Sequence, residues 1–449
     1  MSLEPSKFRL TTRPIGSVDA GPWSWKALAA VLLVSLLVRA LWLWKVNTMP
    51  VTDYWWYFER AVSLSTGNGY AVNGEPTAYW PPGYSLFLSP FFMAIKPAIT
   101  LAKGLNLLLV MLSLVVTFRL AHRLFRSNAI AVVATLLLSF HFSWIAYSGI
   151  LAAEPLYTLL SLVGVYWSLD APGNRKRSFL VGLVFGMATL VRPQAILLPL
   201  LALLWARRDS GNPESHKIWP SIRAAYVGLL LVVVPWAARN VSVLGEPIIV
   251  STNMGDNLLI GNNPAATGRY MPPEEALPTA PGESEFERDK RARSEALTYA
   301  RDNPGVTLRL LPSKLWHTFG YSSDGPYWAF QKVKEVVNVP GTGVDRPLYK
   351  FSKRYTRWYH GAVMLLFLGS LLGSLILRFK GADRLRLPVT GLVLIAYTAL
   401  LSMVFFGNPR FAFPVLPFIC MHAAWLLVLA SRSLVAAQTT GSKPHQRIG

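Results

Sequence analysis

Cysteine and acidic residues are scarce in this chain of 449 residues. The one cysteine, Cys420, has no partner for an internal disulfide, which excludes a secreted scaffold held together by disulfides. Charged residues make up only 15% of the chain, whereas soluble proteins carry about 25%. Hydrophobic residues reach 52%, so the composition argues against a soluble fold.

Patterns that would indicate bound zinc or nucleic acid are also missing. The histidines at 141, 317 and 360 are scattered without the spacing of metal ligands, and no Cys/His zinc pattern occurs. The net charge is nevertheless +21. In a membrane protein this excess has a simple explanation, because Lys and Arg collect in the cytoplasmic loops. We therefore expect no nucleic-acid partner.

Apolar segments long enough to cross a bilayer recur along most of the chain and predict an all-α integral membrane protein. We expect about ten transmembrane helices, interfacial helices and a mixed external loop region. The predicted spans are 28–44, 101–121, 129–148, 154–170, 178–192, 194–206, 223–239, 358–377, 387–406 and 411–431. The short apolar stretch 84–95 predicts an interfacial helix, and 284–302 predicts a helix in an external loop.

Basic clusters fix the predicted sidedness of these spans. With a cytoplasmic N-terminus, every short basic cluster falls in a cytoplasmic loop, as the positive-inside rule requires. The clusters lie at 119–126, 175–177, 207–223 and 378–386. The predicted organisation is a cytoplasmic tail (1–24), an N-terminal transmembrane module (25–239) with an external catalytic loop (46–100), an external loop region (240–357), C-terminal transmembrane helices (358–431) and a cytoplasmic tail (432–449).

Asp53 begins an aromatic run shortly after the first span, and this run also contains Tyr57 and Arg60. Aromatic residues gather at membrane interfaces, so the run could be a simple anchor. A carboxylate held at that surface could instead take a proton from an attacking hydroxyl. Downstream, Pro82 and Tyr84 belong to a rigid Pro-Pro-Gly-Tyr turn that could fold the loop over a site.

More charged residues stand at the predicted external ends of spans. Glu154 precedes Pro155, where an acid can serve a helix N-terminus or act with Asp53 on a substrate or a metal. A divalent cation stays open as a cofactor, because no ligand set is complete. Arg192, Arg239 and Arg410 could bind the phosphate of a donor, or could snorkel or pair structurally. Asn262 and Asn263 in the second loop suit either turns or sugar hydroxyls.

The order of these motifs resembles the GT-C superfamily, specifically the dolichyl-phosphate-mannose–protein mannosyltransferase and aminoarabinose-transferase type. The resemblance covers about residues 25–430. It rests on Asp53 and the following aromatics, Gly67-Asn68-Gly69-Tyr70, Pro81-Pro82-Gly83-Tyr84, Glu154-Pro155-Leu156, Arg192-Pro193 and Arg410-Phe411. It implies a hexosyl- or pentosyltransferase that moves a sugar from a polyprenyl-phosphate donor to an external lipid, glycan or protein acceptor, with inversion at the anomeric carbon.

The resemblance also assigns roles to residues. It implies that Asp53 is the catalytic base, that Glu154 is the second acid and that Arg192 binds the donor phosphate. The alternatives are a transporter or flippase of lipid-linked sugars, which would favour mid-membrane charges and symmetric halves, and a scaffold subunit of the cell envelope. The basic N-terminus favours a bacterial inner membrane, with the active site on the periplasmic side.

Overall fold

The computed structural model describes residues 24–210, 218–331, 346–379 and 387–441. The predicted tail at 1–24 lies almost wholly outside these residues, and so does the end of the tail at 432–449. The described part is helical apart from a two-stranded antiparallel hairpin, β1 (Ala71–Val72) and β2 (Glu75–Pro76). This agrees with the predicted all-α membrane fold.

Among the described residues, five apolar helices are long enough to cross a membrane. They are α1 (Trp25–Lys45), α4 (Ile99–Phe125), α10 (Ile218–Leu244), α17 (Arg346–Phe379) and α20 (Leu416–Gly441), the last extended by the short α19 (Pro409–Ala412) and η5 (Phe413–Val415). Other predicted spans correspond to shorter helices, namely α5 (Asn128–Ser139), α7 (Glu154–Ser168), α8 (Arg175–Val191), α9 (Leu198–Ser210) and α18 (Val389–Val404). The prediction of ten full spans therefore stays a prediction.

One predicted span is wrong as a continuous helix. The segment 129–148 divides at His141, whose backbone is extended (φ −67°, ψ 120°), so α5 ends and the short α6 (Phe142–Ala146) begins. The His141 side chain contacts His360 of α17 at 3.1 Å between ring nitrogens. The hydropathy of the segment itself cannot predict this contact, because His360 lies in a distant helix.

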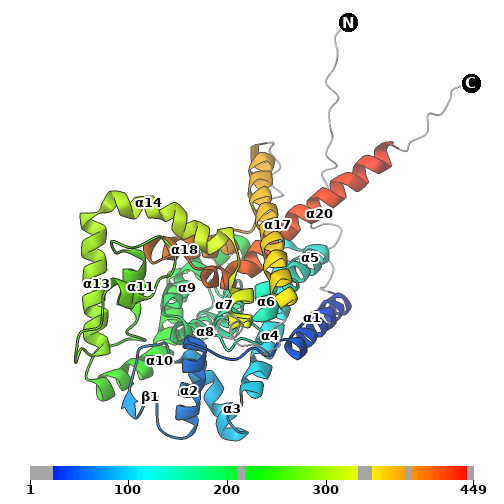
Figure 1. The fold of residues 1–449 in the computed structure, drawn as a ribbon. Coiled ribbons are helices and arrows are strands. Elements are labelled where there is room, and N and C mark those ends of the chain that lie inside the picture. Colours follow the sequence, from blue (N-terminus) through cyan, green and yellow to red (C-terminus); the bar gives the residue numbers. More distant parts are fainter. Residues whose placement is uncertain (1–23, 211–217, 332–345, 380–386, 442–449) are drawn as a thin grey trace, which may run out of the picture.

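The segment that ends in α20 lies at the centre of the helical bundle. Of its most apolar window, 78% is buried, compared with 17–39% in the other four long helices. Helices α5 and α17 pack directly against α20. Figure 1 shows α20 running from the interior toward the C-terminus, beside α17. This arrangement places the residues just before α20, including Arg410, inside the protein.

Two groups of elements outside the long helices build the rest of the molecule. The first group follows α1 and consists of α2 (Asp53–Ser65), the hairpin and α3 (Gly83–Ala94). The second follows α10 and consists of α11 (Met254–Gly261), α12 (Pro273–Ala276), α13 (Glu285–Asp302), α14 (Pro304–Leu315), η3 (Trp316–Gly320) and α15 (Asp324–Ala329). Helices α3 and α13 match the predicted segments 84–95 and 284–302.

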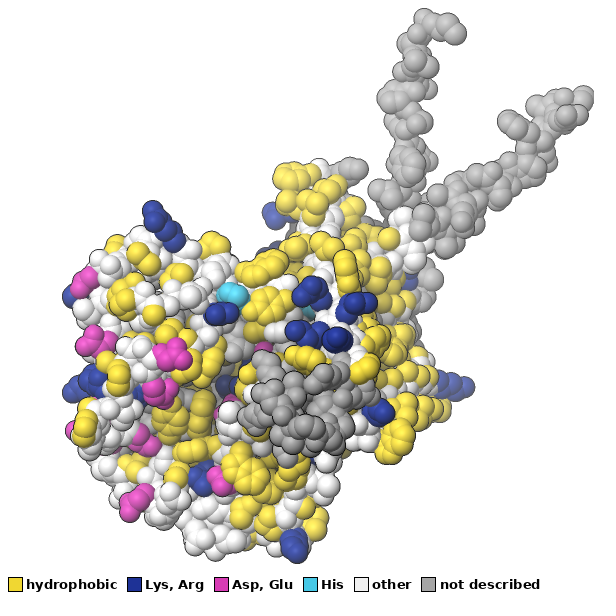
Figure 2. All heavy atoms as spheres, viewed as in Figure 1, with side chains coloured by type: hydrophobic (Ala, Val, Ile, Leu, Met, Phe, Trp, Pro, Cys, Tyr) yellow, Lys and Arg dark blue, Asp and Glu magenta, His cyan; other side chains and the backbone are white. Residues whose placement is uncertain are grey.

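The second group also differs from the rest of the molecule in the charge of its surface. Most acidic side chains visible in Figure 2 gather at the side where Figure 1 has α11 and α13. The opposite side, at α1, presents mainly hydrophobic side chains. Helix α1 accordingly exposes Leu33, Leu37 and Leu41. Such an apolar face suits lipid, whereas the charged group suits water.

Candidate active site

Asp53 and Arg410 meet although 357 positions separate them in the sequence. Asp53 is the first residue of α2, and Arg410 lies in α19 just before the buried helix α20. Arg410 Nη2 donates to Asp53 Oδ2 at 2.8 Å, and its guanidinium lies 5.0 Å from the centre of the Tyr54 ring. Thr52 Oγ1 donates to Asp53 Oδ1 at 3.0 Å. Both carboxylate oxygens of Asp53 are therefore held in place.

Glu154 accepts hydrogen bonds from two guanidinium groups. Its Oε1 is 2.7 Å from Arg410 Nε and 2.5 Å from Arg192 Nη2. Glu154 is the first residue of α7, where Pro155 favours the start of a helix. Arg192 ends α8 with an extended backbone, as expected before Pro193. Glu154 Oε2 is buried and has no hydrogen-bond partner.

These four side chains form one cluster of balanced charge, which we call the carboxylate–arginine cluster (Asp53, Glu154, Arg192 and Arg410). It contains two carboxylates and two guanidinium groups. Their side chains are 9%, 2%, 18% and 13% exposed, in that order. Charges this well buried are expensive unless they are paired, and here each is paired with an opposite charge. The sequence predicted all four positions, and the structure brings them together.

Asp324 is a further acid at this cluster that the sequence did not reveal. It begins α15, and its Oδ2 is buried without a hydrogen-bond partner. Burial raises the pKa of Asp324 to about 7; Arg410 pulls it down, and Glu154 and Asp53 push it up. In the sequence, Asp324 stands in an ordinary loop motif followed by Gly325 and Pro326, so no local signal distinguishes it.

Buried tyrosine hydroxyls surround the cluster. The hydroxyls of Tyr54, Tyr57 and Tyr147 are buried, and that of Tyr57 has no hydrogen-bond partner in the part of the chain that the structure describes. Burial also raises the pKa of Tyr54 and Tyr57, so both phenols keep their protons and can donate. Buried polar groups are normally hydrogen-bonded, so the buried Tyr57 hydroxyl is a candidate donor to a substrate. Tyr57 is thus the residue of the predicted substrate loop with the clearest place beside the cluster.

The other predicted site residues have structural partners. Arg239 donates to the backbone oxygens of Thr77 and Tyr70, so it braces the first loop and does not join the cluster. Tyr84 donates to Asn106 at 2.7 Å, and Pro82 precedes α3. The remaining three contact other protein groups: Arg60 lies 5.0 Å from the Trp56 ring, Asn262 donates to the Leu258 oxygen and to the distant Val404 oxygen, and Asn263 donates to the Leu259 oxygen.

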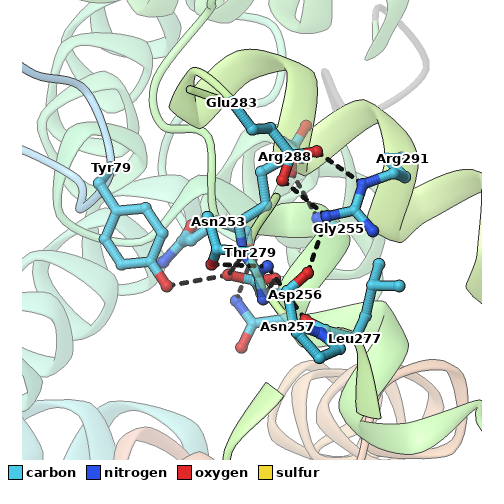
Figure 3. Close-up of polar contacts among 12 residues, drawn as sticks. Tyr79, Asn253, Gly255, Asp256, Asn257, Leu277, Thr279, Glu283, Arg288 and Arg291 are labelled. Carbon is cyan, nitrogen blue, oxygen red and sulfur yellow. Dashed lines mark hydrogen bonds and ion pairs between the residues drawn. The ribbon is translucent and has the colours of Figure 1, made fainter. Parts of the chain in front are cut away.

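A set of polar contacts joins the segment between β2 and α3 to helices α11 and α13 (Figure 3). Tyr79 of the first loop donates to Asp256 of α11 at 2.9 Å, and Arg288 of α13 pairs with the same carboxylate. Glu285 accepts from Thr77 Oγ1 at 2.7 Å and from the Ala78 amide at 2.6 Å. The segment between β2 and α3 is therefore held in place by α11 and α13.

The cluster does not fit a divalent cation. The Arg410 guanidinium already bridges the Asp53 and Glu154 carboxylates, which are the two oxygen ligands that a cation would need. Among the residues that the structure describes, no group of three or more His, Cys, Asp or Glu side chains could hold a metal ion. The geometry instead provides fixed positive charge through guanidinium groups, which bind phosphate well.

Comparison with solved structures relates this arrangement to a known fold. The oligosaccharyltransferase of Archaeoglobus fulgidus matches over 92% of this chain in its apo form, with a TM-score of 0.52 and 13% identity. Its complex with Zn and sulfate matches over 91%, with a TM-score of 0.54 and 13% identity. The chain has the GT-C fold. The chain spans about half of the oligosaccharyltransferase, 52% and 49% in the two structures.

Two further comparisons concern the sequence and a second enzyme. The family model described as dolichyl-phosphate-mannose-protein mannosyltransferase matches residues 80–237, a range that contains Glu154 and Arg192. ArnT from Cupriavidus metallidurans in the apo state matches over 93% of the GT-C chain and 80% of its own length, with 14% identity and a TM-score of 0.37. No curated protein sequence matches the chain. The family match and the shared fold of the oligosaccharyltransferase confirm the resemblance to GT-C proteins seen in the sequence.

Proposed function

We propose that this GT-C chain is an integral membrane glycosyltransferase that moves a sugar from a polyprenyl-phosphate donor to an acceptor at the external membrane face. The carboxylate–arginine cluster is the observation that carries the proposal, together with the fold. The acceptor is a lipid, a glycan or a protein, and the bilayer holds the tail of the donor. The GT-C fold favours this function over the transport of lipid-linked sugars.

The chemistry follows from the different surroundings of the two carboxylates. Asp53 accepts the proton of the acceptor hydroxyl while the acceptor oxygen bonds to the anomeric carbon of the sugar. The bond from that carbon to the phosphate oxygen breaks, and the phosphate leaves with the electron pair. Arg410 and Arg192 stabilise its growing negative charge. Glu154 fixes both guanidinium groups through Oε1.

This division of roles supports inversion at the anomeric carbon. Retention by double displacement needs a second carboxylate that can attack the sugar. Glu154 is only 2% exposed and its Oε1 accepts hydrogen bonds from two guanidinium groups, so we assign it to positioning Arg192 and Arg410 and not to attack on the sugar. A single displacement with Asp53 as the base needs no second nucleophile. We therefore propose an inverting reaction.

The test is sugar transfer by the purified protein in lipid, with a panel of radiolabelled polyprenyl-phosphate sugars and a membrane extract as acceptor. Asp53→Asn should lower the rate by roughly 10²–10⁴-fold, the usual contribution of a general base. Asp302→Asn is the matched control, because Asp302 is exposed and pairs only with its neighbour Arg301. Full activity of a folded Asp53→Asn protein would overturn the assignment. Donor binding by the wild type without transfer from any donor would favour a transporter.

A further inference from the structure

Asp324 approaches the carboxylate–arginine cluster from the second external group of helices. It lies at the N-terminus of α15, which packs against α6. Gly325 permits this close packing, since a Cβ there would lie 2.9 Å from the Ser143 Cα. Ser322 and Ser143 also hydrogen bond at 2.7 Å through their hydroxyls. The position of Asp324 is thus fixed by contacts on both sides of it in the sequence.

Helix α15 also reaches the cluster through aromatic contacts. The Trp328 ring lies edge-on to Tyr54 at 5.1 Å between centroids, and the Arg410 guanidinium lies 5.0 Å from the centre of the same Tyr54 ring. Asp324 therefore belongs to the same buried environment as Arg410. Its Oδ2 is buried and has no hydrogen-bond partner among the described residues, and Asp324 interacts electrostatically with Arg410, one of the two guanidinium groups proposed to hold phosphate.

The charges around Asp324 come from several elements. Arg410 of α19 is the positive group, and Glu154 of α7 and Asp53 of α2 are the negative ones. From the elements packed on α15, Tyr147 follows α6 and interacts with Asp324, whereas Tyr349 of α17 contacts Phe330 beyond the far end of α15. Tyr321 precedes Asp324 in the chain and also interacts with it.

These charges favour a protonated Asp324. The two guanidinium groups of the cluster are already balanced by two carboxylates, so an ionised Asp324 would leave an excess negative charge in a buried place. A donor phosphate adds negative charge and opposes ionisation further. A buried carboxylic acid that keeps its proton at neutral pH can donate a hydrogen bond to a developing anion.

We propose that Asp324 enters the reaction protonated and donates its O–H as a hydrogen bond to the phosphate of the donor as that phosphate leaves. The inference rests on the proposed glycosyltransferase function and adds a third group to phosphate stabilisation, beside Arg192 and Arg410. The proton stays on Asp324 throughout, and the acceptor proton still goes to Asp53. Ionisation of Asp324 removes the donor and places a negative charge against the phosphate.

The sign of the pH effect follows directly. As pH rises through the pKa of Asp324, about 7, the protonated form disappears and transfer should fall. The experiment measures kcat/KM for transfer from about pH 5.5 to 9, because kcat/KM reports the pKa values of the enzyme before the donor binds. It uses the wild-type chain, Asp324→Asn, Asp324→Ala and the exposed control Asp302→Asn, all reconstituted in lipid. Asparagine keeps an N–H donor and cannot ionise.

The expected result is a loss of activity above neutral pH in the wild type and in Asp302→Asn. Asp324→Asn should stay within about tenfold of the wild type at pH 6 and lose the alkaline decline, whereas Asp324→Ala should lose roughly 10–100-fold. An unchanged alkaline decline in Asp324→Asn, or wild-type activity that rises through pH 7, would overturn this inference and leave the proposed function standing. Absence of wild-type transfer at every pH would instead overturn the proposed function.

Discussion

Arg410 joins both acids of the cluster, so its removal affects more than one charge. Arg410→Gln leaves Asp53 without its guanidinium partner and leaves Glu154 with Arg192 alone. Removing one partner of a buried ion pair typically costs about 3–5 kcal/mol, because the other charge stays buried and unpaired. We expect Arg410→Gln to lower the apparent melting temperature in detergent and to abolish transfer.

A double variant separates this contact from general damage. Asp53→Asn combined with Arg410→Gln should be less destabilised than the sum of the two single variants, with a coupling of about 0.5–3 kcal/mol. The same cycle between Arg410→Gln and the exposed Asp302→Asn should be additive. Additive behaviour in both cycles would contradict the Arg410–Asp53 contact.

The sequence could predict those residues of the site whose type is unusual for their surroundings. A carboxylate or guanidinium at the end of an apolar span stands out, as Asp53, Glu154 and Arg410 do. Asp324 has no such contrast, because it lies in a polar loop and reaches the cluster only through tertiary packing. Arg239 shows the opposite error, because it was a candidate for phosphate binding but donates to backbone oxygens in the structure. In the sequence, an Arg with such a structural role looks the same as one that binds a ligand. The catalytic roles themselves stay predictions.

Helices α8 and α10 pack so closely that two glycines are required between them. A Cβ at Gly182 would lie 1.8 Å from the backbone oxygen of Ala225, and a Cβ at Gly228 would lie 2.3 Å from that of Phe179. Small residues allow membrane helices to approach at the backbone. This contact supports the site, because Arg192 follows directly from the end of α8.

Gly182→Ala should therefore weaken the protein even though alanine is a better helix former. The added methyl group forces α8 and α10 apart, so we expect a lower apparent melting temperature and reduced transfer through displacement of Arg192. Gly104→Ala in α4 is the matched control, because no atom lies within 4 Å of its added Cβ. There the change should be neutral or stabilising by up to about 1 kcal/mol. Equal effects of the two substitutions would contradict the close packing.

Elements were predictable where one local pattern dominates. The polar segment around α13 has a Ser284 and Glu287 capping box, and the predicted start at 284 lies next to the observed start at Glu285. The division of the segment 129–148 was not predictable, because apolar residues continue through His141 and hydropathy registers no break. The break depends instead on contacts with α17, which is more than 200 positions away in the sequence.

The sidedness of the whole molecule depends on the distribution of Lys and Arg, and it has a direct chemical test. The predicted cytoplasmic side includes the start of α8, where Arg177 pairs with Asp170 at 3.5 Å. The predicted external side includes the end of α13 at Asp302. Their side chains are similarly accessible, at 57% for Arg177 and 55% for Asp302. Cysteines placed at these two positions should therefore be about equally accessible to a thiol reagent that can reach both sides of the membrane.

The chain is suited to single-cysteine labelling, because its only native thiol, Cys420, is fully buried in α20. In cells with a permeable outer envelope and an intact inner membrane, an impermeant maleimide should label Asp302→Cys and leave Arg177→Cys and the wild type unlabelled. Permeabilisation should then expose Arg177→Cys. The reverse pattern would place α13 and its neighbours in the cytoplasm. Because α15 and α2 contribute to the same cluster as Arg410, that result would move the proposed reaction to the cytoplasmic face as well.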